Sequence, residues 1–144
     1  HDSGQVDVTY TGARWSGERA YEEAGVGPDD IDYASIYDSF TITVLETIED
    51  LGFCDKGDGG EFVEDGALKA PDGKLPFNTD GGGLSSNHPS NRGGMTKIIE
   101  AVRQVRGEAN PEVQVDTDIA LAHGTGGRLA TAHGSVTLVL GGGN

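Results

Sequence analysis

Three consecutive glycines, Gly81 to Gly83, constrain the fold more than any other feature of this sequence. A glycine run packs no side chain and is entropically costly, so it is favoured where the backbone needs a positive φ or a close approach. His88-Pro89 follows, and then a helical pattern from Met95 to Arg106. A loop that opens a helix presents backbone N–H groups to a carbonyl, an oxyanion or a phosphate. We therefore predict that residues 78–89 line a site.

His88 is the chemically active residue of this loop, because histidine exchanges protons near neutral pH. A glycine-rich turn with a surface histidine would have the same composition. A second stretch of the same character, His123-Gly124-Thr125-Gly126-Gly127, favours the functional interpretation. Two glycine–histidine loops in one small domain predict a site that is assembled from loops.

The composition indicates a globular domain and excludes several classes of protein. The 144 residues carry 24 acidic and 10 basic side chains, and the net charge of −14 argues against nucleic-acid binding. No apolar run approaches the ~20 residues of a membrane-spanning helix. The single cysteine, Cys54, excludes an internal disulfide and fits a cytoplasmic protein. The histidines and the cysteine show no metal-ligand spacing, so we predict no metal site.

Hydrophobic periodicity predicts an α/β arrangement. Helices are expected at 11–24, 40–51 and 95–106, and strands at 31–37, 117–122 and 135–140. The buried stripe of the last helix is expected to consist of Ile98, Ile99, Val102 and Val105. The polar stretch 57–74 is expected to run over the surface. A thin sheet with a closing antiparallel hairpin suggests that the domain packs on another half.

Three loops in a fixed order carry a family resemblance: Tyr37-Asp38-Ser39-Phe40, Asn87-His88-Pro89 and the glycine-rich hairpin at the end of the chain. They resemble the C-terminal half of the thiolase superfamily, whose members repeat one βαβαβαββ unit twice. The resemblance implies that residues 1–144 form one thiolase-like C-terminal domain, layered α-β-α with a mixed sheet. The chain begins at His1 without an initiator methionine, so we expect a fragment or one half of a two-half enzyme.

Within the superfamily, the sequence resembles the branch of sterol-carrier-protein thiolases and bacterial lipid-transfer thiolase-like proteins. The finer resemblance lies in Leu51-Gly52-Phe53-Cys54, Gly59-Gly60-Glu61-Phe62-Val63 and the stretch 123–127. Some members are steroid side-chain aldolases, which cleave a β-hydroxyacyl-CoA beside a small OB-fold partner that binds the acyl-CoA. The resemblance implies such a partner, an N-terminal thiolase half and a homodimer. It implies no cofactor other than the coenzyme A of the substrate.

Departures from the thiolase pattern indicate the chemistry. The late catalytic cysteine of thiolases has no counterpart between His123 and Gly127, and Tyr37 stands where the family keeps Asn or His. Thiolysis needs a thiolate nucleophile, whereas retro-aldol cleavage needs a base, an acid and donors for the thioester enolate. We therefore expect retro-aldol cleavage of a β-hydroxyacyl-CoA. The alternatives are a thiolase acting on a β-ketoacyl-CoA and a non-catalytic acyl-CoA or sterol carrier or scaffold.

The resemblance also implies roles for individual residues. Tyr37, His88 and His123 are expected to be catalytic; the respective alternatives are an interface aromatic, a loop-orienting hydrogen bond and structural capping. The expected substrate-binding residues are Asp38, Ser39, Gly82, Gly83, Asn87, Gly124 and Gly126. The related aldolases carry a second tyrosine where this sequence reads Ser85-Ser86-Asn87, so a two-tyrosine mechanism does not transfer. His133 and Cys54 are expected to be structural.

Overall fold

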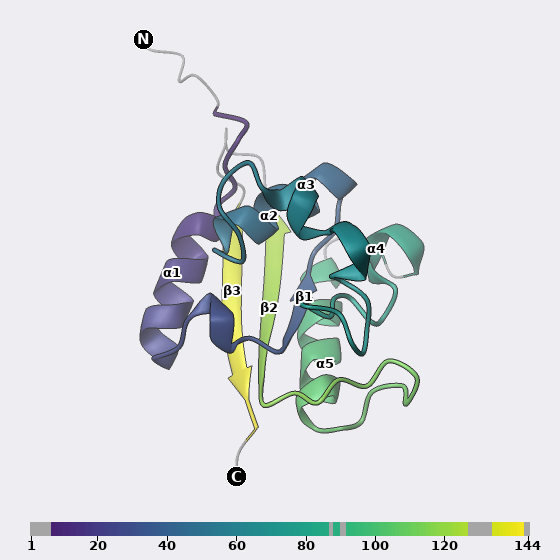
Figure 1. Ribbon diagram of the computed structural model, residues 1–144. Coiled ribbons are helices and arrows are strands. Elements are labelled where there is room, and N and C mark those ends of the chain that lie inside the picture. The colour runs from purple at the N-terminus through teal and green to yellow at the C-terminus, as the bar shows by residue number, and fades with distance from the viewer. Residues whose placement is uncertain (1–6, 87, 90–91, 127–133, 143–144) are drawn as a thin grey trace.

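The computed structural model describes residues 7–86, 88–89, 92–126 and 134–142 (Figure 1). The longer helices are α1 (Ala13–Ala24), α2 (Thr41–Asp50) and α5 (Gly93–Val105), and the strands are β1 (Tyr33–Ile36), β2 (Ile119–Gly126) and β3 (Gly134–Gly141). Shorter turns of helix are η1 (Pro28–Asp30), α3 (Gly59–Phe62), η2 (Glu64–Gly66) and α4 (Gly82–Ser85). The predicted order of the long helices and strands is confirmed.

The strands form a mixed sheet in the order β1-β2-β3. β1 runs parallel to β2, with Tyr33 opposite Ala120 and Ile36 opposite His123. β2 and β3 form the expected antiparallel hairpin. Because side chains alternate along a strand, the two faces of this sheet present different residues to different helices.

Two apolar cores cover the two faces of the sheet. Helices α1 and α2 lie over one face, where Ile48 and Tyr21 pack with Ile36 and Leu121 of the strands. Helix α5 covers the other face, where its Ala101 packs with residues of β1 and β2 that include Tyr33, Ala120 and Ala122 (Figure 1). The structure thus has the predicted α-β-α layers.

The segment between α2 and the glycine run crosses the surface, as predicted. It contains α3 and η2, and its apolar side chains Phe62, Val63 and Leu68 pack at the edge of the core beside α2. Leu75 is buried, and Phe77 forms an isolated parallel bridge with Ala34 of β1. This excursion therefore returns the chain to the edge of the sheet just before the glycine run.

None of the helices in the described residues is long and apolar enough to cross a membrane.

The predicted buried stripe of α5 is wrong in part: Ile98 and Val105 are half-buried against the core, but Ile99 is not. Ile99 is 46% exposed and Met95 is 56% exposed, whereas Lys97, Glu100 and Gln104 are buried. These polar side chains find partners inside the domain: Lys97 pairs with Asp80, Glu100 accepts a hydrogen bond from Thr79, and Gln104 donates to the carbonyl of Val113. Periodicity located the helix, but it did not reveal that polar side chains of α5 are buried against the domain.

A second correction concerns β2. The strand was expected to end at Ala122 and to lead into a loop at His123, but it continues through Gly126. Its last residues pair with the start of β3, down to Gly126 opposite Gly134. Two of these residues, Gly124 and Gly126, are glycines, which are depleted in strands, and the ladder with β3 overrides that local preference.

Candidate active site

Tyr37 and His88 meet at the end of β1 that faces the glycine run. The backbone N–H of Tyr37 donates to the carbonyl of His123 at 2.9 Å, which fixes the start of the turn after the strand. The phenol oxygen of Tyr37 lies 3.0 Å from Nδ1 of His88. The two rings stack with their centroids 6.0 Å apart and an angle of 28° between their planes. The structure therefore brings two of the three expected catalytic side chains into direct contact.

Gly93, the first residue of α5, lets the helix approach the Tyr37 ring. A Cβ atom on this buried glycine would overlap the ring edge, chiefly at Cε2. The Tyr37 ring therefore lies directly against the first turn of α5. Sequence reasoning missed this positioning role, although the pair Gly93-Gly94 at a helix start is a recognisable signal for close packing.

The glycine run is held by acidic side chains on both of its sides. The carboxylate of Asp38 accepts hydrogen bonds from the N–H groups of Gly83 and Leu84, at 2.6 and 3.1 Å. The carboxylate of Asp80 accepts from Gly82 at 3.0 Å. Gly81 and Gly82 have φ values of 87° and 65°, and this left-handed region explains why glycine stands at both positions.

These bonds correct one expectation about the loop. The sequence predicted free N–H groups, but those of Gly82, Gly83 and Leu84 are occupied by Asp38 and Asp80. Asp38, expected to bind substrate, uses both carboxylate oxygens to hold this loop. The glycine run is thus held in place next to the turn at Tyr37. Only Asp80 adjoins the run in the sequence, and Asp38 reaches it through the fold.

Asn78 fastens the same loop to β1. Its amide oxygen accepts from the N–H of Ile36 and its amide nitrogen donates to the carbonyl of Ile36, both at 2.8 Å. The side chain therefore satisfies both backbone groups of the residue that precedes Tyr37. Sequence reasoning did not identify Asn78 as a positioning residue.

His123 lies on the other side of the sheet from the Tyr37 side chain. It pairs in register with Ile36, one residue before Tyr37, so strand alternation directs its imidazole towards α1 and α2. Nδ1 lies 2.8 Å from the hydroxyl of Thr137, which lies 2.8 Å from the hydroxyl of Ser16 in α1. This chain of contacts links three elements and favours the structural alternative for His123.

Burial sets the charge of the His123 imidazole. The residue is 1% exposed, and desolvation lowers its pKa from 6.5 to about 4 despite the opposing effect of Asp50. Its Nε2 has no hydrogen-bond partner among the residues that the structure describes. A neutral imidazole avoids the cost of placing an uncompensated charge in the core.

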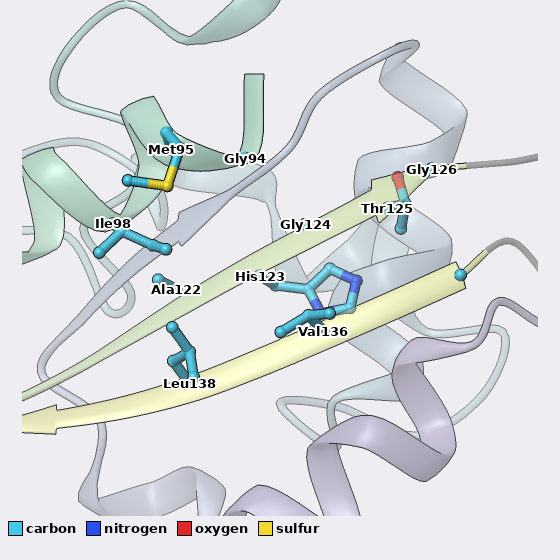
Figure 2. Close-up of a pocket in the computed structure, with 11 residues that line it drawn as sticks. Gly94, Met95, Ile98, Ala122, His123, Gly124, Thr125, Gly126, Val136 and Leu138 are labelled. Carbon is cyan, nitrogen blue, oxygen red and sulfur yellow. The ribbon is translucent and has the colours of Figure 1, made fainter. Parts of the chain in front are cut away.

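A pocket of about 360 Å³ lies between the first turns of α5 and the β2–β3 hairpin. Figure 2 shows Met95 and Ile98 on one side of it and Val136 and Leu138 on the other. Gly124 and Gly126, both expected to bind substrate, line the pocket, and a Cβ atom on Gly124 would stand 3.5 Å from Cα of Gly94. The volume is at the lower end of the range for small-molecule sites, roughly 300–1,000 Å³.

The remaining predicted residues are placed as follows. Ser39 is half-buried, and its hydroxyl donates to the hydroxyl of Thr43 at 3.4 Å in the first turn of α2. Asn87, Gly127 and His133 lie outside the described residues. Cys54 packs at the edge of the core beside α2, and burial, together with the charge of Glu49, raises the pKa of its thiol. In the described part of the chain, no cluster of three His, Cys, Asp or Glu side chains could hold a metal ion.

Known proteins match this chain over most of its length. It is 37% identical over 131 residues to the acetyl-CoA acetyltransferase of Methanothermobacter thermautotrophicus, covering 91% of this chain and 33% of the relative. It is 41% identical over 110 residues to the steroid side-chain-cleaving aldolase of Thermomonospora curvata, covering 76% of this chain and 27% of the relative. The chain thus spans a third or less of the length of these two relatives.

A solved structure matches the fold as well as the sequence. A chain of the Ltp2-ChsH2(DUF35) aldolase superposes with a TM-score of 0.75 and 36% identity, covering 90% of this chain and 31% of that chain. The family model described as thiolase C-terminal domain-like matches residues 1–141. Together with the order of the loops at the end of β1, before α5 and in the final hairpin, these matches establish that the chain belongs to the thiolase C-terminal domain-like family.

Proposed function

We propose that this chain supplies the proton-transfer part of an active site that cleaves a carbon–carbon bond of a β-hydroxyacyl-CoA. The observation that carries the proposal is the 3.0 Å contact between the Tyr37 phenol and Nδ1 of His88. A phenol next to an imidazole is a pair that can take up and release a proton. The similarity to a steroid side-chain-cleaving aldolase supports the same class of reaction.

In retro-aldol cleavage, a base removes the proton of the β-hydroxyl group while the bond between the α- and β-carbons breaks. The electron pair passes to the thioester enolate, and an acid then protonates the α-carbon. The products are a shorter acyl-CoA and a ketone or aldehyde. Tyr37 exchanges the proton at the hydroxyl group or the α-carbon, and His88 relays that proton or binds the thioester oxygen. If Nε2 of His88 carries the ring proton, Nδ1 accepts the hydrogen bond from the phenol.

Thiolysis of a β-ketoacyl-CoA is the second candidate, favoured by the 37% identity to an acetyl-CoA acetyltransferase. Thiolysis needs a thiolate nucleophile. Cys54 is the single cysteine of this sequence, and burial, with the charge of Glu49, raises the pKa of its thiol, so the reactive form is disfavoured. A thiolase would therefore need a cysteine from outside this chain.

An apolar surface supports assembly with another thiolase half. Met95 and Ile99 of α5 are exposed, as are Val136 and Leu138 of β3, although all four are apolar. We propose that an N-terminal thiolase half covers this surface and that the assembled enzyme is a homodimer. The structural neighbour is named as an aldolase of two components, Ltp2 and ChsH2(DUF35), which supports a second partner protein for this chain. We propose an OB-fold protein that binds the acyl-CoA.

The proposal predicts the effect of removing the Tyr37 hydroxyl. General acid–base catalysis typically contributes ~10²–10⁴-fold, so Tyr37→Phe in the assembled enzyme should lower kcat for β-hydroxyacyl-CoA cleavage by about that factor. His88→Ala should cost ~10²–10³-fold if the imidazole binds the thioester oxygen. Tyr10→Phe is the matched control, because the Tyr10 ring interacts with Arg14 and Lys56 in the N-terminal part of the chain. Unchanged turnover in Tyr37→Phe would contradict the proposal.

A further inference from the structure

An ion pair is buried between α5 and the glycine run. Lys97 is 1% exposed, and its Nζ lies 3.0 and 3.1 Å from the two carboxylate oxygens of Asp80. The Asp80 side chain is 10% exposed. Burying two charges costs desolvation energy, and apolar residues of similar volume are often as stabilising as a buried ion pair. A contribution to stability is therefore a weak explanation for this ion pair. Its position between α5 and the glycine run suggests a role in the site.

The pair connects α5 to the loop that leads to His88. One oxygen of Asp80 accepts from Lys97 and also from the N–H of Gly82. Lys97 follows Gly93 by one helical turn, and the Tyr37 ring packs against Gly93. The ion pair therefore fixes the start of α5, where the phenol rests, relative to the loop that continues to the imidazole.

Other contacts hold residues 78–84 of this loop to the rest of the domain. Asn78 and Asp38 hold it to the residues on either side of Tyr37. Thr79, between Asn78 and Asp80, donates to Glu100 of α5 at 2.6 Å and lies 3.1 Å from the phenol oxygen of Tyr33. Burial raises the pKa of Tyr33 to about 12, so this phenol stays protonated and able to donate. The loop is thus tied to both β1 and α5.

We propose that Lys97 is a positioning residue which, through Asp80, sets the distance between the Tyr37 phenol and the His88 imidazole. This inference rests on the proposed function, because it assigns the ion pair a task in the same proton-transfer site. Lys97 acts by holding two parts of the fold together: the start of α5, against which the Tyr37 ring packs, and the loop that leads to His88. A displacement of about 1 Å at a catalytic group can cost ~10²-fold in rate, so a tether of this kind is sufficient to affect turnover.

The test is the neutral double variant Lys97→Met/Asp80→Asn in the assembled enzyme. The side-chain oxygen of an asparagine at position 80 can still accept from Gly82, so the turn keeps its internal bond while the link to α5 is lost. We expect kcat to fall ~10–100-fold and KM to change less than ~3-fold. Arg103→Met is the control, because it removes from the same helix an ion pair whose cation is 56% exposed, while Glu100 keeps its hydrogen bond from Thr79. We expect it to leave kcat within ~2-fold of the parent.

A double-mutant cycle with Tyr37→Phe separates positioning from general destabilisation. If Lys97 acts through the phenol, the double substitution should change kcat by less than ~3-fold in the Tyr37→Phe background. Equal losses in both backgrounds would overturn the positioning role, as would an unchanged kcat in the folded double variant. Asp80→Asn alone, which keeps the volume of the side chain, should lower kcat ~10-fold and replaces the double variant if that variant does not assemble. If Tyr37→Phe alone leaves kcat unchanged, the proposed function fails instead.

Discussion

At the scale of single residues, the two histidines of the described site have different tasks. His88 is exposed and contacts the Tyr37 phenol, whereas His123 is buried on the opposite face of the sheet and contacts Thr137. The sequence pattern singled out both, because each accompanies a glycine-rich stretch. Composition could not separate them, since the difference depends on strand register.

The buried His123 predicts a pH dependence of stability. Its folded pKa of about 4 lies below the ordinary value of 6.5, so the unfolded chain binds the proton more readily between these values. The stabilisation is present above about pH 6.5 and is lost as the pH falls towards 4. Between about pH 7 and pH 4.5, wild type should lose roughly 2–3 kcal/mol more of its free energy of unfolding than His123→Gln. Urea unfolding at the two pH values measures this difference, and equal losses would contradict the assignment.

Gly93 tests the placement of the Tyr37 ring. A methyl group in Gly93→Ala would overlap the ring, so the phenol must move and kcat should fall ~10-fold or more. Gly60→Ala is the control, because a Cβ atom at Gly60 meets nothing within 4 Å. Steady-state kinetics of the assembled enzyme measure the effect. A normal kcat in a folded Gly93→Ala variant would show that the ring position is not important for turnover.

At the scale of elements, α5 shows what sequence periodicity can and cannot establish. The period predicted a helix at 95–106, and the structure has one at Gly93–Val105. The predicted face was wrong in part: Ile98 and Val105 do pack against the core, but Ile99 is exposed. Lys97 and Gln104 are buried instead, by partners in loops that no local pattern reveals. A polar stripe can be the inner face when the loops supply charges and carbonyls to match it.

The exposed apolar side chains of α5 give a prediction about assembly. Ile99→Lys would place an unpaired charge in the proposed interface with the other thiolase half, and such a charge costs several kcal/mol. We expect association to weaken by at least ~10²-fold while the helical content is retained. Val8→Lys, at an exposed apolar residue near the N-terminus, is the control. Sedimentation or size exclusion measures assembly, and intact assembly of Ile99→Lys would place the interface elsewhere.

At the scale of the whole molecule, the order of loops was the most informative part of the sequence. The turn at Tyr37 and the loop at His88 were predicted to share a site, and the 3.0 Å contact between their side chains is consistent with that prediction. The hydrogen bonds and the ion pair that hold the glycine run were not predictable. They depend on Asp38, Asp80 and Lys97, which are brought together only by the packed fold. The catalytic roles themselves stay predictions.

The most direct measurement compares two substrates with the assembled enzyme. We expect it to convert a β-hydroxyacyl-CoA into a shorter acyl-CoA and a carbonyl product, and to leave a β-ketoacyl-CoA with free coenzyme A unchanged. Tyr37→Phe should lose the cleavage activity in the same assay. Thiolysis of the β-ketoacyl-CoA at full rate by both wild type and Tyr37→Phe would contradict the account and identify a thiolase whose cysteine lies outside this chain.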